Sequence, residues 1–163
     1  MVSLRPARAA AGLVFVLALA GCGGSAAKTE PSLSASLVLS TRTVRAGGEL
    51  SGRITVENNT GHSLRTVGCG GIFQVLLTSK TYKPSPIVPT CAKVFTIPRG
   101  RSSYPVTVSA SYNRCSQSGP IGTIPSCTPT GTAPLPPGEY EATTFESGDA
   151  VPLPALVPVR VTR

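Results

Sequence analysis

The chain has 163 residues, of which 40% are hydrophobic but only 5% aromatic, and 15 Lys and Arg against 7 Asp and Glu give a net charge of +8. The basic residues are scattered singly without interleaved aromatic residues, which argues against nucleic-acid binding. A single His and a single Met leave little for copper or iron ligation, so we expect no metal and no cofactor.

The first predicted element is a secretory signal peptide over residues 1–21. Arg5 and Arg8 precede an almost entirely apolar run from Ala9 to Ala20, which is the layout of such a signal. This run is shorter than the ~20 apolar residues that span a bilayer, so a permanent transmembrane helix is the weaker interpretation. Removal of the signal leaves 142 residues, which fits one domain, with 13 basic residues against 7 acidic and a net charge of +6.

The signal ends in Leu19-Ala20-Gly21-Cys22, which resembles the lipobox of bacterial lipoproteins. The resemblance implies that a diacylglycerol alkylates the thiol of Cys22, that the peptide is cut before it, and that the new amino terminus is often acylated. Two or more acyl chains anchor a protein stably, so we expect a membrane partner through lipid on Cys22, on the extracytoplasmic face of the cell membrane. The alternative is ordinary cleavage near Gly21 beside a chance cysteine. Small and polar residues over 22–31 predict a flexible tether.

Residues 32–163 predict an all-β domain, because short alternating runs recur between turn signals and no long pattern has a period of 3.6. Seven strands are expected, at residues 33–39, 50–57, 72–79, 94–97, 104–112, 139–146 and 157–162. The third is apolar on both faces, which predicts a central position in its sheet. Seven short strands favour a single antiparallel β-sandwich.

Two segments resemble immunoglobulin-like bacterial domains. Residues 48–61 (GELSGRITVENNTG) are similar to a strand and turn of many extracellular sandwiches, including the BsuPI-like proteinase-inhibitor domains, and residues 135–142 (LPPGEYEA) to their late Pro-Gly-x-Tyr strand. The resemblance implies an immunoglobulin-like sandwich but no kinship with antibody domains, since a core Trp and the usual inter-sheet cysteine pair are missing. Asn58-Asn59-Thr60 also matches a glycosylation sequon, which we interpret as turn chemistry.

Four cysteines remain once Cys22 is assigned to lipid: Cys69, Cys91, Cys115 and Cys127. An even number in an exported chain suggests two disulfides. Three pairings are possible, and we favour Cys69 with Cys91 and Cys115 with Cys127, because sequential pairs close short loops without crossing. A four-thiolate zinc site is disfavoured, since such sites usually contain close Cys-x-x-Cys pairs and here the nearest pair is separated by eleven residues.

Candidate catalytic residues are few. The only His, His62, lies in a turn after a strand and is predicted to be solvated. Ser-His-Asp catalysis would need it beside Asp149, the only Asp, and a serine on a Gly-x-Ser-x-Gly elbow that the sequence lacks. Glu139 and Glu141 share one face of a strand, and alternation predicts that this face is solvated. We therefore expect a protein that is not an enzyme.

The most distinctive segment is 113–137, which lacks periodicity and is rich in Gly, Pro, Ser and Thr. Connections of this length in compact domains are functional or disordered. A bridge near its tip would display a preorganised apolar contact, formed by Pro120, Ile121, Ile124 and Pro125. The alternative is a packed Ω-like loop that only covers one end of the sandwich.

Three functions remain open at this point. The first is a monomeric, membrane-anchored binding or structural module of the bacterial cell envelope, whose basic surface attracts an envelope protein or an acidic polymer. The alternative is a proteinase inhibitor that presents the loop closed by Cys115 and Cys127, suggested by the loop and by the likeness to BsuPI-like domains. An envelope hydrolase using His62 and Asp149 is the weakest.

Overall fold

The computed structural model describes residues 32–68, 71–87, 93–146 and 150–163, and within them it contains strands and no helix. The nine strands are β1 (Leu33–Leu39), β2 (Thr43–Arg45), β3 (Glu49–Asn58), β4 (Leu64–Gly68), β5 (Phe73–Thr78), β6 (Lys93–Ile97), β7 (Gly100–Ser109), β8 (Gly138–Glu146) and β9 (Val157–Thr162). The all-β prediction is confirmed. In these ranges no helix is long and apolar enough to cross a membrane. The predicted signal peptide, Cys22 and the whole predicted tether lie outside the described residues.

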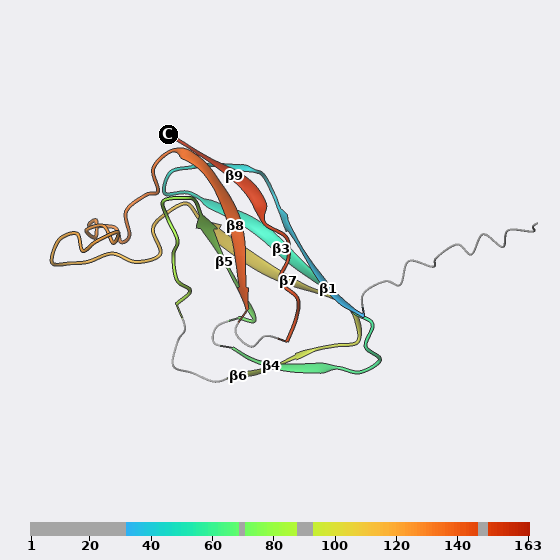
Figure 1. Ribbon diagram of the computed structural model, residues 1–163. Helices are drawn as coiled ribbons and strands as arrows, with labels where there is room; N and C mark the ends of the chain where they lie inside the picture. Colours follow the sequence, from blue (N-terminus) through green and yellow to red (C-terminus); the bar gives the residue numbers. More distant parts are fainter. Residues whose placement is uncertain (1–31, 69–70, 88–92, 147–149) are drawn as a thin grey trace, which may run out of the picture.

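The strands form three sheets (Figure 1). In the first, β3 lies between β1 and β7 and runs antiparallel to both. The second has the order β2-β9-β8-β5, in which the three-residue β2 runs parallel to β9. β4 and β6 form a separate antiparallel pair at the bottom of the view, and the loop over residues 113–137 projects at the upper left.

One hydrophobic core joins the first two sheets. Leu50, Ile54 and Val56 alternate along β3 and are almost completely buried. The four-stranded sheet supplies the buried side chains of Val44, Val75, Leu77, Tyr140, Ala142, Val159 and Val161. Burial of each large aliphatic side chain stabilises the fold by about 1.5–3 kcal/mol. The period-2 pattern of the sequence therefore translates directly into this shared core.

Two strands were missed by the sequence-based prediction, which expected seven. β2 is too short for an alternation to be visible. In β4 the buried positions carry Thr66 and Gly68, whereas Val67 points outward and is 46% exposed. In β4 a polar residue and a glycine therefore point inward and an apolar residue points outward, which is the reverse of the pattern expected for a half-buried strand.

The prediction of a central position for residues 72–79 was wrong. β5 forms the edge of the four-stranded sheet and pairs with β8. Its second apolar face is partly covered by the chain that follows it: Leu76 is half-buried and lines a hollow together with Tyr82, Pro84 and Ile87. Apolar residues on both faces reflected this cover and not a second neighbouring strand.

The predicted strand 104–112 is shifted, since β7 runs from Gly100 to Ser109. Gly100 has a φ of 83°, and the turn it makes after β6 brings it opposite Asn58 at the start of the ladder with β3. At the other end, the Ala110 N–H donates to the Gly48 carbonyl at 2.8 Å, and the chain then leaves the sheet.

The turn after β3 is held by one buried side chain, Asn58, which is 0% exposed. Its Nδ2 donates to the carbonyl oxygens of His62 at 2.9 Å and Pro98 at 3.1 Å. Its Oδ1 accepts from the Thr60 hydroxyl at 2.6 Å and the Thr60 N–H at 3.2 Å. The interpretation of the sequon as turn chemistry agrees with this geometry, because the amide is committed to turn contacts.

Candidate binding site

The base of the loop 113–137 is continuous with the core. The Tyr112 N–H donates to the Ala133 carbonyl at 2.9 Å, and the Leu135 N–H donates to the Ala110 carbonyl at 2.8 Å, so the two arms of the loop pair with each other. Leu135 is 1% exposed and belongs to the hydrophobic core. The two ends of the loop are therefore paired with each other and anchored to the hydrophobic core.

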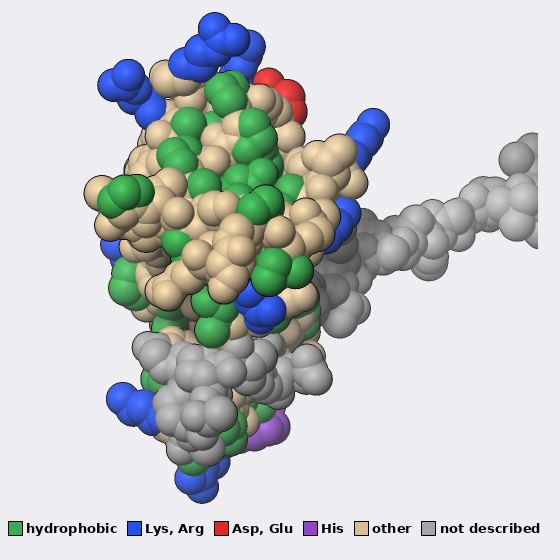
Figure 2. All heavy atoms as spheres, turned by 90° about the vertical axis from the view of Figure 1, so that its left-hand side faces the viewer, with side chains coloured by type: hydrophobic (Ala, Val, Ile, Leu, Met, Phe, Trp, Pro, Cys, Tyr) green, Lys and Arg blue, Asp and Glu red, His purple; other side chains and the backbone are tan. Residues whose placement is uncertain are grey.

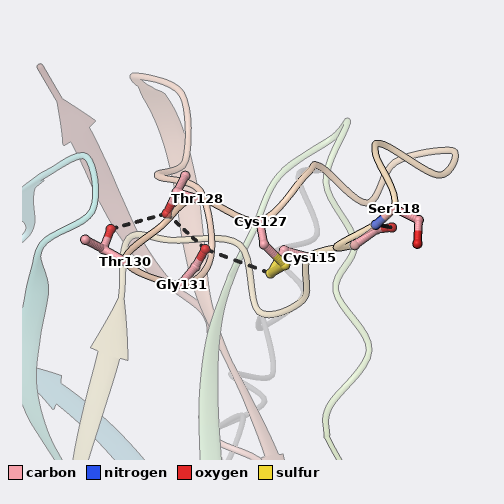
Figure 3. Close-up of a disulfide and its surroundings, with 7 residues drawn as sticks. Cys115, Ser118, Cys127, Thr128, Thr130 and Gly131 are labelled. Atoms are coloured by element: carbon pink, nitrogen blue, oxygen red, sulfur yellow. Dashed lines mark hydrogen bonds between the residues drawn. A yellow bond between two sulfur atoms is a disulfide. The ribbon is translucent and has the colours of Figure 1, made fainter.

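A disulfide closes the middle of the loop (Figure 3). Cys115 and Cys127 are bonded, with their Cα atoms 4.8 Å apart, which confirms the predicted pair. Beside the bond, the Ser116 N–H donates to the Pro125 carbonyl and the Cys127 N–H donates to the Ser116 carbonyl, both at 2.9 Å. The other predicted pair, Cys69 and Cys91, lies outside the described residues.

The tip of the loop is a tight turn. The backbones of Ile121 and Ile124 exchange two hydrogen bonds of 2.9 Å, and Gly122 between them has a φ of 57°. Ile121 is 61% exposed, whereas Ile124 is half-buried, as is Pro125, and Pro120 is exposed. The two isoleucines that the sequence placed together thus point to different surroundings.

A second turn lies between the disulfide and the return to the core (Figure 3). Thr128 and Gly131 exchange backbone hydrogen bonds of 2.7 and 3.1 Å, and Gly131 has a φ of 121°. The Thr128 hydroxyl donates to the same Gly131 carbonyl at 3.0 Å. Backbone hydrogen bonds and one covalent bridge therefore order a segment that contributes little to the core.

Between the loop and the body of the domain lies a hollow of about 390 Å³, which we call the tyrosine groove. Its lining includes Tyr82, Tyr112, Tyr140, Ile124, Pro125 and Pro136. The rings of Tyr82 and Tyr112 meet edge to face, with their centroids 4.9 Å apart, and the Tyr140 hydroxyl donates to the Pro136 carbonyl at 2.9 Å. The floor of the groove is thus aromatic and fixed.

Asn113 ties the segment after β5 to the first residue of the loop. The Tyr82 hydroxyl donates to Asn113 Oδ1 at 3.1 Å and accepts from the Asn113 N–H at 3.0 Å, while Asn113 Nδ2 donates to the Ser85 carbonyl at 2.6 Å. Burial raises the pKa of Tyr82 above its ordinary value, the hydrogen bond from Asn113 opposes this shift, and the nearby phenol of Tyr112 adds to it. Burial likewise raises the pKa of Tyr140.

Two smaller hollows adjoin the tyrosine groove. One of about 160 Å³ is lined by Lys83 and Arg114 together with Tyr82 and Tyr112. The other, of about 220 Å³, includes Leu76 and Ile87 and the same two tyrosines. Figure 2 shows this face of the molecule: hydrophobic side chains gather over it, and Lys and Arg side chains lie around them. None of the described residues that line the three hollows is acidic.

The described residues considered for catalysis, His62, Glu139 and Glu141, are all exposed. His62 is exposed, and its Nδ1 lies 3.2 Å from the Thr60 carbonyl oxygen. Glu139 and Glu141 are both exposed, as alternation predicted, and Glu139 lies 3.5 Å from the Arg160 Nε. Asp149 lies outside the described residues. Across the described ranges no group of three or more His, Cys, Asp and Glu is placed to hold a metal ion.

Comparison with known proteins identifies no family for this chain. No protein-family model matches the chain, and no protein of curated function matches it. Among solved structures, it is similar to a beta-glucosidase from Listeria innocua in complex with glucose, with 14% identity over 80% of this chain and a TM-score of 0.44. A mutant of that enzyme in complex with laminaribiose gives 14% identity over 80% of this chain and a TM-score of 0.45. The chain spans only 16% of the length of either.

Proposed function

We propose that this protein is a lipid-anchored, non-catalytic binding module on the extracytoplasmic face of a bacterial cell membrane. We infer that its domain is an immunoglobulin-like β-sandwich. Two observations support this: two sheets share one core, and the Tyr140 hydroxyl donates to the Pro136 carbonyl, just before the strand that contains Tyr140. A tyrosine that bonds back to the chain a few residues upstream is a recurrent corner of such sandwiches.

The observation that carries the binding function is the order of the loop 113–137. The disulfide and the two tight turns hold exposed apolar groups in one arrangement without burying them in the core. A contact that is already ordered loses little conformational entropy on binding, which favours affinity. The proposal therefore places partner recognition on the face that carries the loop and the tyrosine groove.

The membrane anchor rests on the lipobox-like sequence that ends in Cys22. Because β1 begins at Leu33, a lipid on Cys22 would leave a tether of about ten residues before the sandwich. Growth of a bacterial expression host with a labelled fatty acid tests this anchor. The label should appear on the membrane-bound protein and be lost in Cys22→Ser, while the neighbouring Gly23→Ala retains it. Equal labelling of Cys22→Ser would contradict the anchor.

Capture from envelope extracts tests the binding role. The full chain is compared with a variant in which residues 116–126 are replaced by Gly and Ser while Cys115 and Cys127 are kept. The native chain should retain a partner that the variant does not, and circular dichroism should show the same fold for both. Equal retention by both chains, or no partner at any salt concentration, would remove the loop from the proposed function.

A second candidate, a proteinase inhibitor, is favoured by the exposed Ile121 on a disulfide-closed loop. Against it, the two reciprocal hydrogen bonds between Ile121 and Ile124 occupy backbone groups that an extended peptide would offer to another chain. Inhibition assays with serine, cysteine and metalloproteases test this candidate, with the loop-replaced chain as the control. Inhibition by the native chain alone would favour the inhibitor.

A further inference from the structure

We propose that the tyrosine groove and the two hollows beside it bind an extended peptide segment that carries an acidic side chain two positions from an apolar one. This inference rests on the proposed binding function and names the class of partner for the same face. The hollows of about 390, 160 and 220 Å³ all include Tyr82 and Tyr112 in their lining. They therefore adjoin one another around a single pair of rings.

The walls of this site suit apolar side chains. Ile124 and Pro125 stand on the loop side of two of the hollows, and Pro84 stands across from the loop, in the segment that follows β5. Successive side chains of an extended peptide point in opposite directions, so alternate residues enter neighbouring hollows. Because the Cys115–Cys127 bond and the Ile121–Ile124 turn fix the loop wall, the hollows exist before the peptide arrives.

The charge of the site selects an acidic partner. Lys83 and Arg114 both line the hollow of about 160 Å³, and none of the described lining residues opposes them with a carboxylate. A carboxylate between them gains charge-assisted hydrogen bonds, in which an arginine side chain can donate two at once. Both cations are exposed, so salt screens their attraction for the carboxylate.

The polar groups of the groove favour a peptide over a sugar. The Tyr82 hydroxyl and the Asn113 side chain, which would otherwise bond to sugar hydroxyls, are already bonded to each other and to the Ser85 carbonyl. The Tyr140 hydroxyl is bonded to the Pro136 carbonyl. Besides hydroxyls such as those of Thr81, Thr123 and Thr132, the site offers a ligand apolar surface and two cations, which match an apolar and an acidic side chain two positions apart.

Binding of defined peptides to the full chain, purified from membranes in detergent, tests the inference. The probes are short peptides in which Pro, Val or Leu stands two positions from Asp or Glu, and matched peptides with Asn or Gln at the acidic positions. The acidic peptides should bind at least about tenfold more tightly than their amide counterparts, because a hydrogen bond to a charged group contributes about 1.5–3 kcal/mol. Added salt should weaken the difference.

The variant Lys83→Glu/Arg114→Glu should lose at least about tenfold in affinity for the acidic peptides. Arg65→Glu/Arg99→Glu is the matched control, since both of its side chains are exposed and lie outside the three hollows. Ile124→Ser should also weaken binding, because it removes part of the apolar wall. Thermal unfolding followed by circular dichroism verifies that each variant is folded.

Several results would overturn the inference. One is equal affinity of the acidic peptides for the native chain and for Lys83→Glu/Arg114→Glu. Another is binding of an anionic polysaccharide or of phosphatidylglycerol vesicles, and of no peptide, with loss in the same variant. Concentration-dependent self-association that Ile124→Ser abolishes would assign the groove to a second copy of this chain. If no peptide binds but loop-dependent capture from envelope extracts persists, the peptide class fails while the proposed function stands.

Discussion

The two-sheet core and the loop 113–137 are ordered by different forces. In the core, strand pairing brings together apolar side chains such as Ile54, which is 0% exposed, and burial stabilises the arrangement. In the loop, backbone hydrogen bonds and the Cys115–Cys127 bridge hold the chain while Ile121 remains 61% exposed.

Under the proposed function, the residues that stabilise the fold and the residues that contact a partner are therefore different ones. A side chain that stabilises the core by being buried is unavailable to a partner, whereas a loop ordered by its backbone leaves its side chains free for contact. The tyrosines lie at the border between the two regions, since Tyr140 belongs to β8 and also lines the groove. Substitutions in the core should therefore lower the stability of the fold. Substitutions at the tip of the loop should weaken partner binding and leave the stability almost unchanged.

The largest loss of stability is expected for Ile54→Ala in β3. The variant removes buried methyl and methylene groups from the centre of the three-stranded sheet, which should lower the free energy of unfolding by about 2–5 kcal/mol. Urea unfolding followed by circular dichroism measures the change. Val38→Ala on the neighbouring β1 is the control, because Val38 is 65% exposed and its truncation should change stability by about 0.5 kcal/mol or less. Similar losses for both would contradict the assigned core.

A smaller loss is expected for Cys115→Ser/Cys127→Ser. The bridge joins residues separated by 12 positions, and the chain-entropy model predicts a loss of about 3 kcal/mol or less without it. Hydrogen exchange should show faster exchange at the amides of Ser116 and Ile121, with protection retained in β3. Ser118→Ala is the control in the same loop. A loss of protection spread evenly over both regions would mean that the loop and the core are not separate.

Stability at alkaline pH tests how the tyrosines between the core and the loop contribute to folding. Burial raises the pKa of Tyr82 and of Tyr140 above the ordinary value of 10.0, so the folded chain keeps phenol protons that the unfolded chain releases. Their contribution to the free energy of unfolding is complete below pH 10.0 and is lost as the pH rises through the folded pKa values. Urea unfolding at graded pH, together with tyrosinate absorbance, measures this loss.

Substitution of tyrosine by phenylalanine, which removes the titrating hydroxyl, is the control for this pH dependence. Tyr82→Phe/Tyr140→Phe should flatten the fall in stability, while Tyr104→Phe, which removes a phenol beside Phe73 outside the groove, serves as the matched variant. A slope that is identical in the native chain and in the double variant would show that these two phenols do not couple to folding.

The smallest effect on stability is expected for Ile121→Ser at the tip of the loop. Because the side chain is 61% exposed and the turn is held by backbone bonds, the free energy of unfolding should change by about 0.5 kcal/mol or less. Capture of a partner from envelope extracts should nevertheless weaken. A large loss of stability would show that the tip contributes to the core after all.

The sequence predicted the core better than the loop because alternation reports burial directly. The strand with Leu50, Ile54 and Val56 is found where it was expected, whereas β4 was missed because Thr66 and Gly68 occupy its inward positions. Periodicity also carries no information about what covers a strand, so the two apolar faces of residues 72–79 predict a central strand where the structure has the edge strand β5.

The candidate site was predicted only in part. Cysteine counting found the Cys115–Cys127 pair, and composition found the loop that it closes. The groove depends on contacts that no local pattern contains, since Tyr82 and Asn113 are 31 residues apart in the chain. Likewise, the flanking prolines predicted one shared apolar contact for Ile121 and Ile124, but the turn between them leaves Ile121 exposed while Ile124 lines the groove.

The parallel pairing of β2 with β9 has a consequence for the order of folding. Thr43 lies opposite Arg160, and the Ala46 N–H donates to the Thr162 carbonyl at 2.8 Å. In the four-stranded sheet, β2 is therefore paired through β9. Until residues 157–162 are present, β8 and β2 both have an unpaired edge. Contacts between such distant parts of a chain slow folding. The four-stranded sheet is therefore expected to close late, after the strands that pair with nearer neighbours.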